Sequence, residues 1–368
     1  MTNDSNGKKT PLWKRKALVL PACVLIFVGL RGIILARLIS GRYSLSSFAV
    51  DAAAGIVLVT LLQFLDELLK EKLSSAIGAN SLARRLATRA IRLPVLVLVF
   101  GTFLLATIQM HPARIGCAET PAAFGMDYEA HEVQTDDGVR ISAWTIPSKD
   151  TQRPVVVVTH GLGANKQNFL HVSSLIHKLN YNVVAFDFRS HGDSGGHTCS
   201  LGVHEARDVK AAFDLAQSQF PDRPVYAWST SLGAAATLRA AAHYQIFDKL
   251  VVDASFSSVK NLAMETKFCY FGPLATPAWN ISRLWFAAYA HADIENYAPE
   301  DDIAEITCPI FLIHGERDPM IPPSELERLK SAAKARTISW LAPGAGHSAS
   351  FQHPDCPRRL ADFYDNFQ

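Results

Sequence analysis

The stretch that decides the fold is VYAWSTSLGAAA, which runs from Val225 to Ala236. Its first residues are typical of a β-strand, Ser231 follows in a serine-rich turn, and an alanine-rich helix is expected immediately afterwards. This order is typical of a sharp strand-to-helix turn, written G-x-S-x-G, that lifts one serine hydroxyl above the edge of a sheet. The sequence therefore predicts Ser231 as a candidate nucleophile.

The turn strains the serine backbone, so the residues two positions before and after the serine must be small. Gly233 meets this requirement on one side, whereas Ser229 stands where the pattern has glycine. Serine is the next smallest polar residue, and we interpret the departure as tolerable. Taken alone, the stretch remains compatible with a serine-rich turn that has no chemical role.

Composition limits the class of protein. The chain has 368 residues, enough for one large domain and a smaller region, and its formal net charge is only +2. No basic helix interleaved with aromatic residues is present, which argues against a nucleic-acid partner. The six cysteines form no C-x-x-C pair and no zinc-type spacing, so we expect no metal site, and disulfide bonding stays open. Nucleophilic catalysis by a serine needs no cofactor, and none is expected.

Three apolar runs near the N-terminus predict a membrane region over residues 1–110. The first is Ala17–Leu30, continued by Ile33–Ile39, the second is Ala52–Leu65, and the third is Leu93–Met110. The third run has no charged residue and is long enough for a bilayer core of about 30 Å, so we expect about three transmembrane helices. The first run is alternatively a cleaved signal peptide. Another alternative is that the first two runs form amphipathic helices on the membrane surface.

The distribution of basic residues predicts the orientation of this region. Lysine and arginine are concentrated before Ala17 and between Lys70 and Arg92. The positive-inside rule places both segments in the cytoplasm, so three spans would put the following domain on the extracytoplasmic side of a plasma or inner membrane. Residues 111–125 contain several glycines and prolines and are expected to be a linker to a catalytic domain over residues 126–368.

After the linker, strand patterns and helix patterns alternate. A hairpin is expected first, and Val155–Thr159 reads as a strand buried on both faces. Further strands are expected at Asn182–Phe188, Val225–Trp228, Lys249–Ala254, Pro309–His314 and Thr337–Leu341, and helices at Lys166–Leu179, Val203–Gln219, Leu232–His243 and Pro323–Ala335. Such alternation predicts an α/β fold with a mostly parallel sheet flanked by helices. Residues 257–305 interrupt it and are expected to form a small helical cap.

Several short motifs occur in an order that resembles the α/β-hydrolase fold, in particular the Bem46-like, serine-aminopeptidase-like and monoacylglycerol-lipase-like serine hydrolases. They are HGLG at His160–Gly163, DFRSHGDSGG at Asp187–Gly196, STSLG at Ser229–Gly233, HGERDPMIP at His314–Pro322 and GAGHS at Gly344–Ser348. The resemblance covers residues 126–368. Ser229 and the membrane region depart from the usual pattern of this family.

The chemistry of a serine nucleophile requires a histidine base that is oriented by a carboxylate. In this fold the three residues follow the order serine, acid, histidine, which Ser231, Asp318 and His347 keep. Asp318 and His347 each follow a predicted strand, so both are expected at the same edge of the sheet as Ser231. Asp253, at the end of another strand, is the rival acid.

The oxyanion of an acyl-transfer intermediate needs backbone N–H donors. One is expected from Leu232, the residue after the nucleophile. The resemblance implies that the other is the N–H of Leu162 in the HGLG turn. We expect His160 to pack beneath that turn rather than to act as a base.

The predicted cap is rich in aromatic side chains: Phe268, Tyr270, Phe271, Trp279, Trp285, Phe286 and Tyr289. They could line a slot for an acyl chain or form the core of the cap itself. We expect a membrane-anchored serine hydrolase that cleaves carboxylic, lipid-like esters through an acyl-enzyme and contacts membrane lipids. The alternatives are a peptidase with the same three residues and a catalytically silent hydrolase fold that serves as a scaffold.

Overall fold

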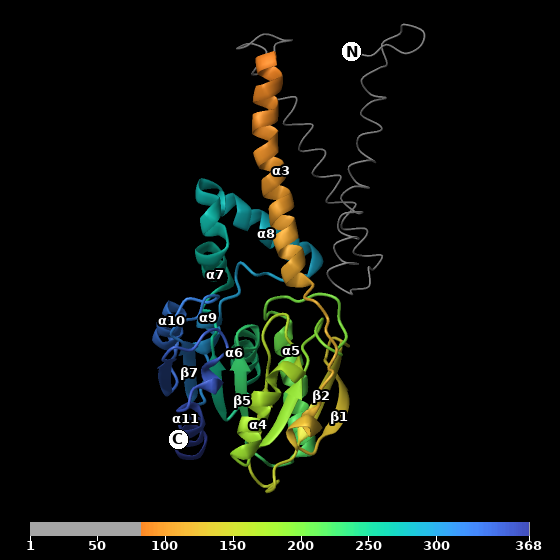
Figure 1. The fold of residues 1–368 in the computed structure, drawn as a ribbon, viewed down its shortest axis with the longest axis vertical. Coiled ribbons are helices and arrows are strands. Elements are labelled where there is room, and N and C mark those ends of the chain that lie inside the picture. The colour runs from red at the N-terminus through yellow and green to blue at the C-terminus, as the bar shows by residue number, and fades with distance from the viewer. Residues whose placement is uncertain (1–81, 368) are drawn as a thin grey trace, which may run out of the picture. The chain divides into compact units, whose positions relative to one another are not determined.

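The computed structural model describes residues 82–367, and the chain divides into two compact units, Met1–Leu104 and Leu105–Gln368. The first two predicted membrane spans lie outside the described residues. The second unit contains every strand in the described part of the chain and all the candidate site residues, and it is described by itself below (Figure 1).

The second unit is built on an eight-stranded sheet with the strand order β1-β2-β4-β3-β5-β6-β7-β8. Strand β2 pairs antiparallel with both β1 and β4, and every other neighbouring pair is parallel, as the alternating pattern predicts. The strands are β1 (Glu129–Gln134), β2 (Arg140–Ile146), β3 (Val155–Val158), β4 (Asn182–Phe186), β5 (Val225–Thr230), β6 (Lys249–Asp253), β7 (Ile310–Gly315) and β8 (Thr337–Ala342).

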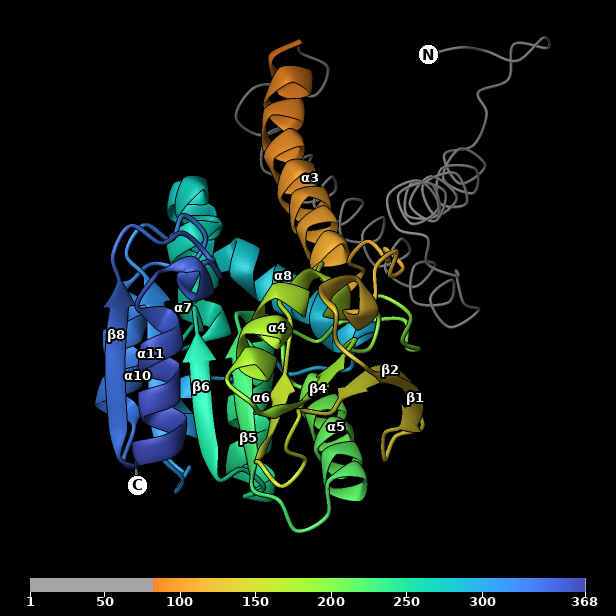
Figure 2. The ribbon, with the colours of Figure 1, turned by 60° about the horizontal axis from the view of Figure 1, so that its bottom comes forward.

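Helices connect the strands and cover both faces of the sheet (Figure 2). The α-helices are α3 (Leu82–Met110), α4 (Leu170–Lys178), α5 (Glu205–Gln219), α6 (Leu232–Tyr244), α7 (Val259–Thr266), α8 (Ala275–Tyr289), α9 (Pro299–Ile303), α10 (Ser324–Ala332) and α11 (Cys356–Ala361). Short helices of other types are η1 (Pro121–Phe124), η2 (Lys166–Phe169), η3 (Phe268–Leu274), η4 (Ser350–Gln352) and η5 (Asp362–Asn366).

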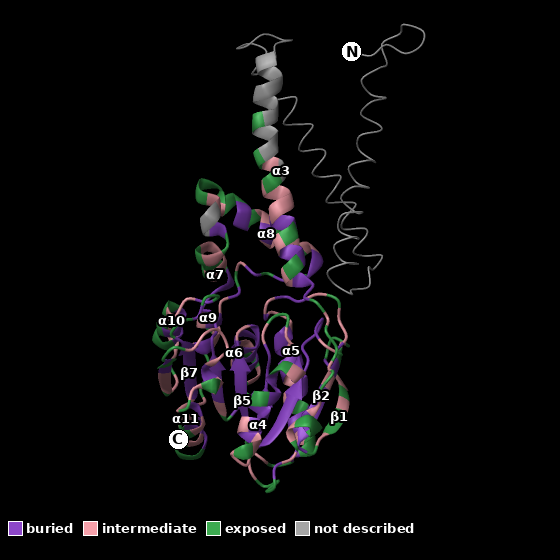
Figure 3. Cartoon of the chain, viewed as in Figure 1, coloured by how far each residue is buried: buried purple, intermediate pink, exposed green. Residues whose placement is uncertain are grey.

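The core lies on the two faces of the sheet, which is buried throughout its centre (Figure 3). In β3, Val155 and Val157 pack with α5 and α6, whereas Val156 and Val158 pack with α4 and α11. A strand with both faces covered must be apolar at every position, which explains the run of four valines. This burial fixes the carboxyl ends of the parallel strands, where the candidate site residues lie.

Helix α3 includes Leu93–Met110, which we predicted as a third membrane span. Among the residues that the structure describes, no helix is long and apolar enough to cross a membrane. The last turn of α3 belongs to the second unit, where Ala106, Thr107 and Met110 are buried. The Met110 carbonyl accepts a hydrogen bond from the Cys199 N–H at 2.7 Å.

The segment expected as a linker, residues 111–125, is bonded to the second unit. The Asn165 side-chain amide donates to the Ile115 carbonyl at 2.8 Å, and the Ala118 N–H donates to the Gln167 side chain at 2.6 Å. Arg114 donates to the carbonyls of the glycines at 195 and 196. These bonds hold the segment against the turns that precede α4 and follow β4.

The long connection between β6 and β7 contains α7, η3, α8 and α9. We call residues 256–294, which include α7, η3 and α8, the cap segment. Trp279 and Phe286 of α8 are buried, and Phe268 of η3 packs edge-on against Trp279 with ring centroids 6.1 Å apart. The cap segment therefore has an aromatic core of its own.

Candidate active site

Ser231 lies between the end of β5 at Thr230 and the start of α6 at Leu232. Its backbone angles are φ 55° and ψ −121°, a strained conformation for a residue with a side chain. The Ser231 N–H donates to the carbonyl of Asp253 in the neighbouring strand at 2.9 Å. The strained turn is the one that the sequence predicts, and it presents the hydroxyl at the carboxyl edge of the sheet.

The two residues that flank the turn fit it in different ways. A Cβ added at Gly233 would overlap the Thr159 side chain and the His160 carbonyl, so glycine is required there. Ser229 is fully buried, and its hydroxyl donates to the Val251 carbonyl of β6 at 2.8 Å. Serine at this position is thus accommodated by a hydrogen bond across the sheet.

A chain of hydrogen bonds joins the three residues that the sequence analysis brought together. His347 Nε2 lies 3.1 Å from Ser231 Oγ, and His347 Nδ1 lies 2.7 Å from Asp318 Oδ2. Because a carboxylate only accepts, Nδ1–H donates to Asp318, which leaves Nε2 free to accept the serine proton. This is the arrangement required of a general base beside a nucleophile.

Asp318 is held in place on its other oxygen. Its Oδ1 accepts hydrogen bonds from the N–H groups of Met320 and Ile321 at 2.8 and 2.9 Å. Burial acts to raise the pKa of Asp318, but hydrogen bonds from His314, His347 and these N–H groups lower it below its ordinary value. The carboxylate therefore stays ionised and keeps a fixed orientation towards His347.

The rival acid, Asp253, is fully buried at the end of β6. Neither of its carboxyl oxygens has a hydrogen-bond partner in the described part of the chain. Burial raises the pKa of Asp253 to about 7, and the neighbouring Ser350 side chain and the charges of His314 and His347 oppose this shift. The hydrogen-bonding geometry thus favours Asp318 over Asp253 as the partner of His347.

The raised pKa of Asp253 predicts a pH-dependent stability. The folded chain keeps this proton up to about pH 7, whereas the unfolded chain loses it near pH 4, so stability falls as the pH rises between these values. Asp253→Asn removes the titration, and the loss of melting temperature between pH 5 and pH 8 should become smaller. Thermal denaturation of both proteins across this range measures the difference, and equal slopes would contradict the prediction.

One predicted oxyanion donor, Leu232, follows Ser231 in the chain, and the other, Leu162, lies in the turn whose Gly161 approaches the Ser231 side chain. The N–H groups of Leu162 and Leu232 donate no hydrogen bond within the described residues, whereas the neighbouring Gly163 N–H donates to His191 Nε2 at 3.1 Å. Both Leu162 and Leu232 line the same cavity as Ser231. Two uncommitted N–H groups beside the hydroxyl suit an oxyanion.

His160 lies beneath the turn that carries Leu162. Its Nδ1 lies 2.8 Å from the Gly161 carbonyl, and its Nε2 accepts from the Phe188 N–H at 3.0 Å. A carbonyl accepts and an N–H donates, so this imidazole is neutral, and burial lowers its pKa well below the ordinary value. His160 therefore fixes the turn and has no nitrogen left for a base or a ligand.

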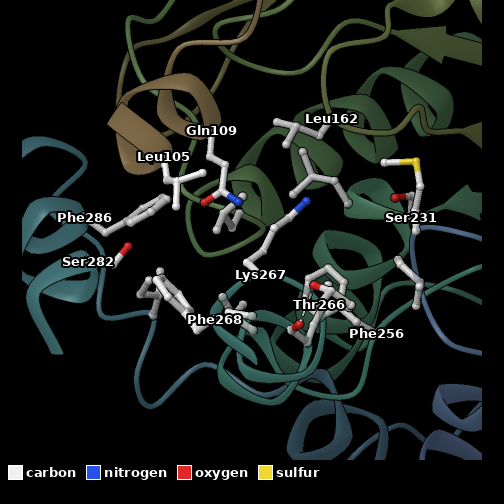
Figure 4. Close-up of a pocket in the computed structure, with 18 of the residues that line it drawn as sticks. Leu105, Gln109, Leu162, Ser231, Phe256, Thr266, Lys267, Phe268, Ser282 and Phe286 are labelled. Carbon is white, nitrogen blue, oxygen red and sulfur yellow. Dashed lines mark hydrogen bonds between the residues drawn. The ribbon is translucent and has the colours of Figure 1, made fainter. Parts of the chain in front are cut away.

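Ser231 and His347 open into a largely apolar cavity of about 150 Å³ (Figure 4). Its walls include Phe268, Trp279 and Phe286 of the cap segment. These aromatic residues are also buried, so they serve both as cap core and as pocket wall. Of the other predicted aromatic residues, Phe271 and Trp285 are half-buried, Tyr289 is buried, and the side chain of Tyr270 lies outside the described residues.

Part of the pocket could not be identified from the sequence. Leu105 and Gln109, from the last turns of α3, line the cavity, although the sequence analysis placed them in a membrane span. Lys267, at the end of α7, also lines it. In the sequence, Gln109 and Lys267 are distinguished only as polar residues in an otherwise apolar or aromatic stretch.

One group of three possible metal ligands occurs among the described residues: Cys117, Asp187 and Asp193. The Lys166 ammonium already lies 2.6 Å from Asp187 and 3.1 Å from Asp193. Burial raises the pKa of the Cys117 thiol to about 11, which keeps it protonated and a poor ligand. The cluster is therefore better described as a lysine–carboxylate contact that supports the turns near the site.

Comparison with known families and structures adds independent findings. Residues 155–363 match the model of the alpha/beta hydrolase family, and residues 117–173 match a partial alpha/beta-hydrolase lipase region. The esterase Pf2001 of Pyrococcus furiosus superposes with a TM-score of 0.57 at 25% identity, covering 69% of this chain and 97% of that one. The alpha/beta hydrolase GrgF of Penicillium superposes with a TM-score of 0.52 at 16% identity, covering 66% of this chain and 99% of that one, which supports the fold alone.

Sequence relatives include lipases. The chain is 25% identical over 272 residues to the lysophosphatidylserine lipase ABHD12 of Xenopus tropicalis, covering 64% of this chain and 68% of that protein. It is 26% identical over 271 residues to the protein of the same name in Rattus norvegicus, covering 63% and 65%. The chain thus spans about two thirds of the length of these lipases.

Proposed function

Because the chain belongs to the alpha/beta hydrolase family, we propose that it is a serine hydrolase that cleaves carboxylic esters with apolar acyl groups. The observation that carries this proposal is the hydrogen-bond chain from Ser231 Oγ through His347 to Asp318, with distances of 3.1 and 2.7 Å. A catalytically silent scaffold would not require this alignment. Labelling of Ser231 by a fluorophosphonate tests the proposal.

The proposed reaction proceeds in two stages. His347 Nε2 takes the proton of Ser231 Oγ as the oxygen attacks the ester carbonyl, and Asp318 stabilises the imidazolium that forms. The N–H groups of Leu162 and Leu232 bind the oxyanion of the tetrahedral intermediate. The imidazolium then gives its proton to the departing alcohol, which leaves an acyl-enzyme. Water, activated by His347 in the same way, releases the carboxylic acid and restores the serine.

The nature of the cavity supports an apolar acyl group. Its lining is mostly aliphatic and aromatic, and no aspartate or glutamate occurs among the described lining residues. Apolar walls favour a hydrocarbon chain by removing it from water. The similarity to lipases and to an esterase is consistent with a lipid-like ester.

A peptidase with the same three residues is the alternative, and the lack of an acidic group for a peptide N-terminus disfavours it. We predict that kcat/KM is higher for carboxylic esters with apolar acyl groups than for aminoacyl amides. Initial rates over a series of ester chain lengths and a series of aminoacyl amides measure this preference. Faster cleavage of any amide than of every ester would promote the peptidase.

We also propose that the protein associates with membranes through the apolar runs at residues 17–39 and 52–65. The support is the low charge of these runs and the basic residues that precede them. We predict that the full chain stays in the membrane fraction after alkaline carbonate extraction, and release into the supernatant would contradict this. Protease treatment of intact cells would then show on which side the hydrolase unit lies.

A further inference from the structure

The cavity contains a positive charge that the proposed ester chemistry does not use. Lys267 is the C-cap residue of α7, and of the described residues that line the cavity it is the one with a permanent charge. In the described part of the chain, its side chain is exposed and makes no hydrogen bond or ion pair. Figure 4 shows this side chain extending into the pocket, towards the space between Gln109 and Ser231.

Gln109 supplies a second polar group at the same place. It reaches the cavity from the last turn of α3, and its side-chain amide also has no partner among the described residues. In Figure 4 the amide end faces the Lys267 side chain. An ammonium and an amide together offer a charged and a neutral N–H donor, and both are suited to the oxygen atoms of a phosphate or a carboxylate.

No acidic side chain occurs among the described residues that line the cavity, which favours an anion at this position. Glu265, the acidic residue nearest to Lys267 in the chain, is already paired with Arg328. The segment from Lys267 to Ala292 contains no aspartate and no glutamate, and its other formal charge is Arg283. By contrast, Lys260 of the same helix is already paired, because its ammonium lies 2.5 Å from Glu295.

We propose that Lys267, assisted by Gln109, binds an oxyanionic group of the substrate and makes the enzyme prefer negatively charged single-chain esters to neutral esters. This inference rests on the proposed hydrolase function, with the ester carbonyl at Ser231 and the apolar chain along Phe268 and Phe286. The oxyanion, a phosphate or a carboxylate borne by the same molecule, pairs with the ammonium. Lys267 is then a specificity-determining residue that takes no part in bond breaking.

A simpler role for Lys267 is to stabilise the C-terminal end of α7, where a positive charge interacts favourably with the helix dipole. If Lys267 has only that role, its removal changes the stability of the protein and affects the binding of charged and neutral ligands equally. The ratio of affinities or rates between charged and neutral ligands therefore distinguishes the two roles, whereas a measurement of stability alone does not.

Binding is tested first, without turnover, in the full-length Ser231→Ala variant. Titration calorimetry compares octyl phosphate with octanol, which share the same chain, and we expect octyl phosphate to bind about tenfold more tightly. Adding Lys267→Met should abolish this preference while octanol binding stays the same, whereas Lys260→Met is the matched control and should retain it. Equal weakening of both ligands, or an unchanged preference, would overturn the proposal.

Inorganic phosphate identifies the source of the anion. If the site serves an anion carried by the substrate, inorganic phosphate at millimolar concentration should not displace octyl phosphate. Half-displacement at that concentration would assign the site to a free anion and contradict a role in substrate selection.

Turnover is tested in the otherwise unchanged protein with monooctanoylglycerol and monooctanoylglycerol phosphate. Lys267→Met should lower kcat/KM for the phosphate about tenfold, chiefly through KM, and leave the neutral ester within about twofold. Lys267→Arg should restore most of the selectivity. If the Lys267→Met protein hydrolyses both esters with unaltered selectivity, the anion-site inference is refuted and the proposed function stands. If the protein binds octyl phosphate but hydrolyses neither ester, the proposed function is refuted and the anion site stands.

Discussion

Replacing Ser231 with alanine is expected to abolish ester hydrolysis, with a loss of turnover on the order of a million-fold, because it removes the attacking oxygen. The fold should be unaffected, since the deleted hydroxyl lies at the cavity and its hydrogen bond is to His347. Alanine also retains the Ser231 N–H, which anchors the turn to Asp253. Hydrolysis rates and circular dichroism of the purified full chain test the two parts of this expectation.

Ser229→Ala is the matched control, since Ser229 lies two residues away in the same turn. It removes the buried hydrogen bond to the Val251 carbonyl, which should lower the free energy of unfolding by about 1 kcal/mol and leave activity within a few-fold. An inactive Ser229→Ala protein beside an active Ser231→Ala protein would show that the wrong serine had been assigned.

The second large effect is expected from Asp318→Asn, with a loss of kcat of about ten-thousand-fold. The N–H groups of Met320 and Ile321 donate to Oδ1, so an asparagine would keep its oxygen there and direct its NH₂ group towards His347. His347 Nδ1 would then accept a hydrogen bond instead of donating one. The proton would move to Nε2, which could no longer take the proton of Ser231.

Asp253→Asn provides the comparison at the rival position. Its carboxyl oxygens have no hydrogen-bond partner within the described residues, so the substitution should change kcat only mildly. A severe loss in Asp253→Asn with a mild one in Asp318→Asn would move the catalytic acid from the loop after β7 to the end of β6. Steady-state kinetics of both variants decides between the two aspartates.

The sequence predicted the structure best where the residue types and their expected burial indicate the same element or the same edge of the sheet. The four valines of β3 could be assigned because a strand covered on both faces has no polar position. Ser231, Asp318 and His347 could be grouped because residues that follow parallel strands meet at one edge of the sheet. The sequence assigned Asp318 as the acid with Asp253 as its rival, because Asp253 ends β6 and Asp318 follows the neighbouring strand β7. The structure adds that Asp318 is the one within hydrogen-bond distance of His347.

Other features depend on contacts that periodicity does not encode. An apolar helix end gives the same pattern whether lipid or protein covers it, so the position of Leu105 and Gln109 in the pocket could not be predicted. Helix α11 is short and carries two adjacent arginines, so its amphipathic pattern is weak. The hydrogen bond that accommodates Ser229 depends on Val251 of a different strand.

The central claim, that Ser231 is the nucleophile of an acyl-transfer enzyme, is tested most directly by fluorophosphonate labelling. The full-length protein and its Ser231→Ala and Ser229→Ala variants are treated with the probe, digested and analysed by mass spectrometry. The account predicts a single phosphonyl adduct on Ser231 in the unmodified protein and in Ser229→Ala, and none in Ser231→Ala. An adduct on another residue, or equal labelling of all three proteins, would contradict it.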